Sequence, residues 1–346
     1  MEYRRLGRSG CAVSAFALGT LTFGAATDKQ EAFAQLDAFV EAGGNLVDTA
    51  DVYVDGTSEM IIGQWFADRP NDVTDRVVLA TKGRFATNRR DPNGVGSSRR
   101  HLDRALTASL RRLGLETIDL YQVHAWDPLT PLEETLSFLD DAIRAGKIRY
   151  YGLSNFTGWQ VQKAVDLASS LGLARPVTLQ PQYNLLSREI EWEIVPTCEH
   201  NGLGLLPWSP LASGILTGRY QRDIEPVPGQ RLFQKENARL FGDRMNEQRT
   251  WEVIHVLNAV AERHDATVSQ VALAWVVAQP AVTSVILGAR TLEQLKENLE
   301  ASALLLNAEE EEQLAAASRP SIDYPYGGMA LRQRRRKIQG GWHHDS

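Results

Sequence analysis

Short apolar runs alternate with helical patterns along most of the chain, and this alternation limits the fold more than any other feature. Eight runs read as β-strands, at residues 15–18, 46–48, 77–81, 118–123, 148–153, 177–181, 204–208 and 284–287. Helical periodicity predicts helices at residues 29–42, 58–66, 98–113, 131–145, 157–171, 189–201, 246–264, 268–279 and 291–301. Strands that alternate with helices favour parallel pairing. Eight such units predict the fold class α/β, as a (β/α)8 TIM barrel.

The chain has 346 residues, more than the roughly 250 that such a barrel needs. We expect the excess to form an N-terminal β-hairpin over residues 3–14, a long loop after strand seven and a C-terminal loop and tail from about residue 302. No Pro/Ser-rich linker interrupts the sequence, so residues 1–346 are expected to form a single domain. A doubly wound sheet is the competing architecture. It is expected to carry a G-x-G-x-x-G turn after an early strand, and the sequence contains no such turn.

Charge and composition disfavour several classes of binding partner. The formal net charge is −6, which disfavours nucleic acid, and no uncharged apolar run is long enough for a membrane span. The start of the sequence has no apolar signal core, and Cys11 and Cys198 lack metal-like spacing. The sequence therefore predicts a cytoplasmic protein with no metal site, and it leaves homo-oligomer formation open. The basic run at residues 332–337 could bind an anion, but it is interpreted as a solvated end, and His343 and His344 alone are weak evidence for metal binding.

Four side chains with complementary proton chemistry fall at or after the ends of three predicted strands. Asp48 ends one strand and Tyr53 follows it, whereas Lys82 and His124 come directly after the next two. Neighbouring parallel strands lie about 4.8 Å apart, and barrel active sites form at the carboxyl ends of the strands. Each residue alone has an ordinary structural explanation, such as a strand cap or a core histidine. Together they indicate one catalytic site.

The chemistry of this set suits proton transfer to a carbonyl oxygen. Tyr53 can act as general acid toward the oxygen on which negative charge develops. The pKa of a free phenol is about 10, and a neighbouring ammonium, Lys82, is expected to lower it. Asp48 can pair with Lys82 and hold it charged, and His124 can donate a second hydrogen bond to the carbonyl.

Several sequence blocks occur in a fixed order over residues 3–302. They are Asp48-Thr49-Ala50-Asp51-Val52-Tyr53 with Gly56, Ser58 and Glu59; Ala80-Thr81-Lys82; Gln122-Val123-His124; Gly152-Leu153-Ser154-Asn155-Phe156; Pro207-Trp208-Ser209-Pro210-Leu211-Ala212-Ser213-Gly214; and Leu287-Gly288-Ala289-Arg290 with Gln294, Glu297 and Asn298. This order resembles the aldo-keto reductase family, in the branch that includes potassium-channel β subunits and bacterial sugar and aldehyde reductases. The resemblance implies a (β/α)8 barrel that reduces carbonyls with a nicotinamide cofactor.

The resemblance also implies which residues hold that cofactor. Ser154, Asn155 and Gln180 would bind the carboxamide, and Trp208 would stack on the nicotinamide. Gly19 and Thr20 would let the backbone approach the cofactor closely. The full expected set is Gly19, Thr20, Asp48, Ser154, Asn155, Gln180, Trp208, Ser209, Pro210, Leu211, Gly214, Arg219, Arg231, Gly288, Arg290, Gln294 and Asn298.

The phosphate end of the cofactor separates NADPH from NADH. Many family members place a lysine, a serine and an arginine after strand eight, where this chain has Gly288, Ala289 and Gln294. In the channel-subunit branch, basic residues of the loop after strand seven hold part of the 2′-phosphate. Arg219 and Arg231 lie in that loop here, Arg290 is a third candidate, and the helix near Thr291 is expected to present its N-terminus to the anion. We therefore favour NADPH over NADH.

The substrate is less constrained by the sequence. Phe23, Trp126 and Phe156 are expected to wall an apolar pocket beside Tyr53 and His124, and Tyr324 and Tyr326 to reach over it. The predicted function is NADPH-dependent reduction of aldehydes or ketones to alcohols, with a small-molecule carbonyl as substrate. The alternative is an NADP(H)-binding sensor or accessory subunit with slow turnover. A sugar-processing reductase would share the fold and cofactor and differ only in substrate.

Overall fold

Eight parallel strands form one curled sheet in the computed structural model, which describes residues 1–87, 90–322 and 324–327. The strands are β3 (Phe16–Gly19), β4 (Leu46–Asp48), β5 (Val78–Gly83), β6 (Ile118–Val123), β7 (Ile148–Ser154), β8 (Thr178–Gln180), β9 (Gly204–Leu205) and β10 (Val285–Gly288). Their spatial order is β10-β3-β4-β5-β6-β7-β8-β9, so each strand pairs with its neighbours in sequence, and β10 pairs with β3.

The two outer strands of this order also approach each other. Leu205 of β9 forms a parallel bridge with Val282, just before β10. The backbone N–H of Thr283 donates to the Leu205 carbonyl at 2.8 Å, and that of Ile286 donates to the Pro207 carbonyl at 2.9 Å. The curled parallel sheet is consistent with the (β/α)8 barrel that the alternation predicted.

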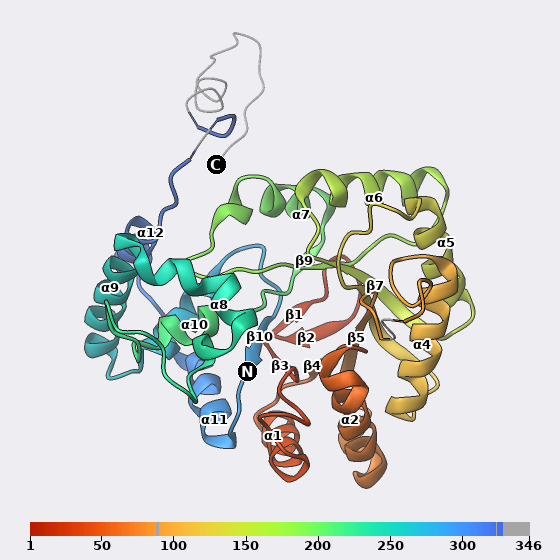
Figure 1. The fold of residues 1–346 in the computed structure, drawn as a ribbon, viewed down its shortest axis with the longest axis horizontal. Helices are drawn as coiled ribbons and strands as arrows, with labels where there is room; N and C mark the ends of the chain where they lie inside the picture. The colour runs from red at the N-terminus through yellow and green to blue at the C-terminus, as the bar shows by residue number, and fades with distance from the viewer. Residues whose placement is uncertain (88–89, 323, 328–346) are drawn as a thin grey trace.

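Helices surround the strands (Figure 1). They are α1 (Lys29–Glu41), α2 (Thr57–Asp68), α3 (Asn71–Thr74), α4 (Arg99–Leu113), α5 (Leu132–Arg144), α6 (Gly158–Ser170), α7 (Ile194–Asn201), α8 (Lys235–Phe241), α9 (Gln248–His264), α10 (Val268–Ala278), α11 (Leu292–Glu300) and α12 (Ala308–Ala317). Local sequence sets several of their ends. Asp28 and Ser98 cap α1 and α4 with their side chains, and Gly114 and Gly202 end α4 and α7 in the left-handed conformation.

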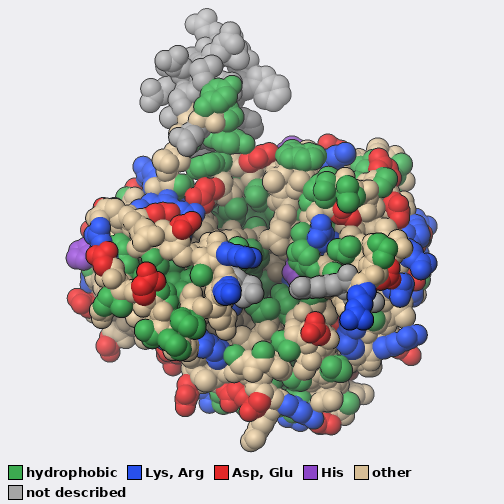
Figure 2. Space-filling view, in the orientation of Figure 1, with side chains coloured by type: hydrophobic (Ala, Val, Ile, Leu, Met, Phe, Trp, Pro, Cys, Tyr) green, Lys and Arg blue, Asp and Glu red, His purple; other side chains and the backbone are tan. Residues whose placement is uncertain are grey.

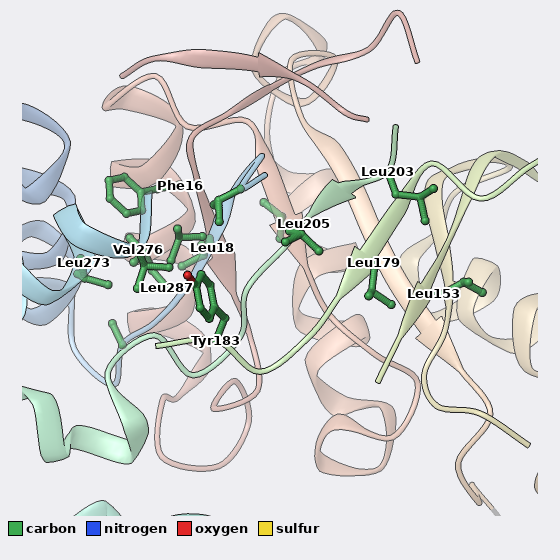
Figure 3. Close-up of a cluster of buried hydrophobic side chains, with 14 of the residues drawn as sticks. Phe16, Leu18, Leu153, Leu179, Tyr183, Leu203, Leu205, Leu273, Val276 and Leu287 are labelled. Atoms are coloured by element: carbon green, nitrogen blue, oxygen red, sulfur yellow. The ribbon is translucent and has the colours of Figure 1, made fainter. Parts of the chain in front are cut away.

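Apolar side chains fill the space between the strands and the helices. Figure 3 shows part of this core, in which Phe16, Leu18 and Leu287 of the strands lie near Leu273 and Val276 of α10. A second cluster lies on the other faces of the strands and consists of Leu6, Val13, Ala17, Leu46, Ala80, Leu120, Leu206 and Ile286. The strands are therefore packed on both faces, as expected of a parallel sheet.

A two-stranded antiparallel hairpin covers the amino end of the sheet. It comprises β1 (Tyr3–Arg5) and β2 (Ala12–Ser14), and its Leu6 and Val13 belong to the second cluster. Gly7 lies in its turn with a φ of +57°, where a Cβ atom would stand 2.0 Å from the carbonyl oxygen of Val177. The hairpin thus packs tightly against the chain that enters β8.

Some segments differ from the sequence-based expectation. The C-terminal segment expected as a loop from about residue 302 contains α12, which Asn307 caps and which Arg188 anchors through the Ala315 carbonyl and Ser318 Oγ. The helix expected over residues 189–201 is divided, because the 3-10 turn η2 (Glu189–Glu191) precedes α7. The long segment after β9 contains α8 and short 3-10 turns.

Some expectations concern residues or features away from the sheet. Residues 332–337, His343 and His344 lie outside the described residues. Among the described helices, none is long and apolar enough to cross a membrane. Within the same described ranges, no group of three or more His, Cys, Asp or Glu side chains could hold a metal ion.

Candidate active site

The strands bring the four candidate catalytic residues together at the carboxyl end of the sheet. Lys82 of β5 is fully buried, and its Nζ lies 2.6 Å from Asp48 Oδ2 at the end of β4. The same Nζ lies 3.1 Å from Tyr53 Oη and donates to the Thr49 carbonyl at 2.8 Å. His124 follows β6, and its ring centroid is 6.1 Å from that of Tyr53 in an edge-on arrangement. One ammonium therefore contacts both the acid and the phenol.

Two glutamines hold the remaining oxygen of Asp48. Gln180 Nε2 donates to Asp48 Oδ1 at 2.8 Å, and Gln122 Nε2 donates to the same atom at 3.1 Å. Both glutamines are buried, Gln122 in β6 and Gln180 in β8. With Lys82 on its other oxygen, the Asp48 carboxylate is fully engaged, so its position is fixed.

Burial and charge shift the protonation of this cluster. Burial raises the pKa of Tyr53, and Asp48 adds to the rise, whereas Lys82 opposes it. The expected lowering by Lys82 is thus present, but burial outweighs it. Burial disfavours the charge of Lys82, but Asp48 and Tyr53 outweigh that effect and raise its pKa. Burial, together with Lys82 and Arg84, brings the pKa of His124 well below its usual range, so the imidazole is neutral.

A cavity of about 520 Å³ opens beside this cluster. Figure 2 shows a hollow near the middle of this face with basic side chains at its rim. All the expected cofactor residues line the cavity, namely Gly19, Thr20, Asp48, Ser154, Asn155, Gln180, Trp208, Ser209, Pro210, Leu211, Gly214, Arg219, Arg231, Gly288, Arg290, Gln294 and Asn298. Tyr53 and His124 line it as well, whereas Lys82 lies behind Tyr53. The structure therefore gathers residues from nearly the whole chain around one space.

The expected substrate walls are placed differently. Phe23 is fully buried in the core, and Trp126 packs edge-on against Phe156 and Trp159; none of the four is among the lining residues. Tyr326 stacks on Trp192, away from the cavity lining, and the Tyr324 side chain is 86% exposed.

Sequence reasoning missed other lining residues. They include Leu21, Phe85, Tyr220, Leu240 and Glu297. The ring of Phe85 lies 4.6 Å from that of His124. Phe85 comes three residues after Lys82, so an aromatic residue just past a strand end was the signal that could have identified it.

The residues expected near the nicotinamide ring form a connected wall. Asn155 has a left-handed φ of 56°, and its Nδ2 donates to the His124 carbonyl at 3.0 Å. Trp208 Nε1 donates to Asn155 Oδ1 at 3.0 Å, and Ser154 Oγ donates to the Gln180 carbonyl at 3.0 Å. These bonds fix the wall relative to Tyr53 and His124.

Three arginines also line the cavity. Within the described ranges, Arg219, Arg231 and Arg290 form no ion pair, and Arg290 Nη1 donates to the Gly229 carbonyl at 2.9 Å. Burial, together with Arg290, lowers the pKa of Arg231. A Cβ atom on Gly288 would lie 3.6 Å from Arg231 Nη1, so the glycine leaves space beside this guanidinium. Arg231 and Arg290 are partly buried and Arg219 is exposed. Guanidinium groups that have no acidic partner among the described residues fit an anionic group such as a cofactor phosphate.

The sequence suggested that the first turn of α11 presents its amides to an anion, but protein groups occupy several amides there. The backbone N–H of Leu292 donates to Glu31 Oε1 of α1, and that of Gln294 donates to Thr291 Oγ1 at 3.3 Å. The N–H of Arg290 donates to Gln294 Oε1 at 3.0 Å. Because protein groups already satisfy these amides, anion binding here would depend on the arginines.

Comparison with known proteins agrees with this architecture. The model of the "Aldo/keto reductase family" matches residues 15–319. A protein of Oryza sativa subsp. japonica named "Probable voltage-gated potassium channel subunit beta" is 38% identical over 303 residues, which cover 87% of this chain and 91% of that protein. The Bacillus subtilis (strain 168) protein "Uncharacterized oxidoreductase YrpG" is 36% identical over 323 residues, covering 89% and 93%. The "Norsolorinic acid reductase" of Aspergillus flavus is 31% identical over 329 residues, covering 92% and 81%. This chain therefore belongs to the aldo/keto reductase family.

Proposed function

We propose that this protein is an NADPH-dependent reductase that converts aldehydes or ketones to alcohols, and that residues 1–346 act as one (β/α)8 barrel domain. Family membership and the relatives named as oxidoreductases support carbonyl oxidoreduction. One observation carries the finer proposal: Lys82 Nζ contacts both Asp48 Oδ2 and Tyr53 Oη beside the cavity.

The proposed reaction consists of a hydride transfer and a proton transfer. A nicotinamide cofactor held by the cavity residues would provide the hydride for the carbonyl carbon. Tyr53 Oη gives its proton to the carbonyl oxygen, so the products are the alcohol and a phenolate. Lys82 stabilises that phenolate at 3.1 Å, and Asp48 keeps Lys82 charged. The neutral His124 donates a hydrogen bond to the carbonyl oxygen and so holds it near Tyr53.

The cavity residues have matching roles in this proposal. Ser154, Asn155 and Gln180 would bind the carboxamide, and Trp208 would cover the nicotinamide ring. Arg231 and Arg290, with Arg219, would bind the 2′-phosphate, which NADH lacks. These arginines support NADPH, because within the described ranges their guanidinium groups have no acidic partner and can bind a dianion.

A second candidate function is an NADP(H)-binding sensor or accessory subunit with slow turnover. The names of the rice relative and of a similar Schizosaccharomyces pombe protein, "Putative voltage-gated potassium channel subunit beta", favour it. It uses the same site and differs in turnover.

Steady-state oxidation of NADPH, and separately of NADH, with a panel of aldehydes, ketones and sugar-derived carbonyls tests the proposal. We expect turnover with NADPH, retained in Tyr324→Phe, whose ring is 86% exposed, and largely lost in Tyr53→Phe. Arg231→Ala should raise the KM for NADPH more than that for NADH. Tight NADPH binding without turnover would favour the sensor, and normal activity of Tyr53→Phe would remove Tyr53 as the acid.

A further inference from the structure

A second polar cluster lies behind Tyr53, between β5, α2 and α4. Its centre is Asp51, which follows β4 and is 1% exposed. The backbone N–H of Asp51 donates to the Lys82 carbonyl at 3.0 Å, so this residue is tied to the strand that carries the lysine. Sequence reasoning gave Asp51 no role, although it lies two residues from Tyr53.

The carboxylate of Asp51 lacks ordinary partners. Neither of its oxygens has a hydrogen bond of normal geometry within the described residues, although the Val52 backbone N–H approaches them. The buried Tyr121 hydroxyl also has no hydrogen-bond partner in the described ranges. An unpaired buried carboxylate is costly, so its retention beside an active site calls for an explanation.

The neighbouring charges do not neutralise Asp51. Glu59 of α2 is fully buried, and its Oε2 pairs with Arg112 Nε of α4 at 2.6 Å. Its Oε1 accepts from Thr81 Oγ1 at 2.6 Å. On the β4 and β5 side, Lys82 is already paired with Asp48. The cluster therefore holds one negative charge more than its cations can pair.

Burial and the nearby Glu59 raise the pKa of Asp51 to about 7, although Arg112 and Lys82 act in the opposite direction. The charge of Asp51 thus changes near neutral pH. Ionised Asp51 in turn adds to the rise in the pKa of Tyr53, whereas Lys82 lowers it. The two acids are coupled through their shared surroundings.

We propose that Asp51 is a positioning residue that sets how readily Tyr53 releases its proton, because its carboxylate competes with the Tyr53 phenolate for the positive charge of Lys82. Protonated Asp51 makes Tyr53 a stronger acid, and ionised Asp51 makes it a weaker one. When Tyr53 gives its proton to the carbonyl oxygen, the phenolate gains a negative charge. If Asp51 then takes a proton from solvent, its own negative charge is removed, and the Tyr53 phenolate no longer has a negative neighbour at Asp51. The inference rests on the proposed role of Tyr53 as the acid.

The test is a spectroscopic titration of Tyr53 in the full chain. The ultraviolet absorbance of phenolate is followed against pH, and the Tyr53 share is isolated by subtracting the matching Tyr53→Phe chain in each background. Asp51→Asn keeps the shape of the side chain and removes its charge. We expect it to lower the ionisation pH of Tyr53 by about one unit, which is tenfold in the acid constant. The basic limb of the kcat/KM profile for reduction should move by the same amount.

Tyr121→Phe is the matched control. It removes the other unpartnered polar group of the cluster without changing any charge, so the Tyr53 titration should stay where it is in the unmodified chain. The proposal is overturned if Asp51→Asn leaves the titration in place, or if Tyr121→Phe shifts it as far. The titration needs no turnover, so an unmodified chain that reduces no carbonyl would count against the proposed function and would leave this test valid.

Discussion

The two ends of the curled sheet differ in the side chains that they bury. At the amino end, the β1–β2 hairpin packs Leu6 and Val13 against the apolar cluster of the strands, and Gly7 lies against the Val177 backbone. At the carboxyl end lie a buried ion pair, a neutral histidine and a carboxylate, that of Asp51, which has no hydrogen-bond partner among the described residues. The amino end buries apolar side chains, which stabilises the fold, whereas the carboxyl end holds buried polar groups that lower the free energy of unfolding. Buried polar groups of this kind indicate that the candidate active site lies at the carboxyl end of the sheet.

Backbone strain follows the same division. Positive φ angles at non-glycine residues recur in loops at the carboxyl end: 49° at Val54, 143° at Arg84, 56° at Asn155 and 52° at Ser209. Such conformations cost about 1–3 kcal/mol each and persist where the surroundings enforce them. Val54 follows Tyr53, and Arg84 comes two residues after Lys82. The strain is therefore stored next to the residues that the proposed mechanism uses.

The largest effect is expected from Lys82→Met. Without the ammonium, the phenolate of Tyr53 loses its stabilising charge, and kcat for carbonyl reduction should fall roughly a thousandfold, equivalent to about 4 kcal/mol. The variant also leaves the Asp48 carboxylate buried without its cation, so the free energy of unfolding should drop by about 3–5 kcal/mol. Steady-state kinetics and urea unfolding measure the two losses.

The double variant Asp48→Asn with Lys82→Met separates these effects. Removing both charges should recover most of the stability, because position 48 then carries no charge that has lost its partner. It should recover none of the activity. Recovered reduction in the double variant would contradict the role of the ammonium, and unrecovered stability would contradict the charge argument.

The second effect is the pH dependence of stability at Asp51. Its pKa in the folded chain, about 7, lies above the ordinary 3.8. Between these values the folded protein binds more protons than the unfolded chain, so the free energy of unfolding falls as pH rises through this window and stays low above it. The shift corresponds to a loss of the order of 4 kcal/mol. Asp51→Asn should remove this loss.

Urea unfolding of both chains at about pH 5 and about pH 8 measures that difference, across a window that covers most of the titration. The lowered pKa values of His101 and His124 act in the opposite direction in the same window, because the unfolded chain binds more protons at those sites. The decisive quantity is therefore the difference between the two chains. If that difference is the same at both pH values, Asp51 does not titrate as described.

Gly7→Ala probes the amino end, with a smaller effect. The left-handed φ and the backbone oxygen 2.0 Å from the added Cβ should destabilise the fold by about 3 kcal/mol. Because the hairpin lies at the opposite end from the cavity, kcat at a temperature where the variant is folded should be unchanged. Gly10→Ala, in the same hairpin, has no atom within 4 Å of its added Cβ and should be neutral. A large change in kcat with Gly7→Ala would show that the two ends are not independent.

The strand ends were the most predictable part of the molecule. Periodicity placed the fourth predicted strand at residues 118–123, where the structure has β6, and thereby placed His124 at the carboxyl end of the sheet. Residues at the ends of adjacent parallel strands must meet, so the contact between Lys82 and Asp48 follows from position alone. Contacts between side chains deeper in the strands cannot be predicted from their position in the sequence. Gln122 reads as one more buried strand residue, and nothing in the sequence shows that it holds Asp48.

Long-range and energetic features were also beyond the sequence. Glu31 satisfies an amide of α11 across 261 residues, and this contact determines whether the helix can accept an anion. The direction of the Tyr53 shift depends on how much burial opposes the charge of Lys82, and only the packed structure gives that balance. The helix α12 was missed because its Ala/Glu-rich sequence has only a narrow apolar side, with Leu314 as its one buried hydrophobic residue.

The smallest effect is expected from relieving strain at the carboxyl end. Val54 has φ 49° and ψ 47°, a conformation that costs a β-branched residue about 1–2 kcal/mol and that glycine adopts without strain. Glycine also has more conformational freedom in the unfolded chain, which lowers the free energy of unfolding by about 0.5–1 kcal/mol. Val54→Gly should therefore stabilise the fold by up to about 1 kcal/mol and lower kcat, because the loop that holds Tyr53 becomes less restricted. Asp265→Gly is the control: it has φ 50° at the end of α9, outside the cavity lining. It should stabilise by a similar amount and leave kcat unchanged. If both variants leave kcat unchanged, strain at the carboxyl end is a by-product of tight loops and has no part in positioning Tyr53.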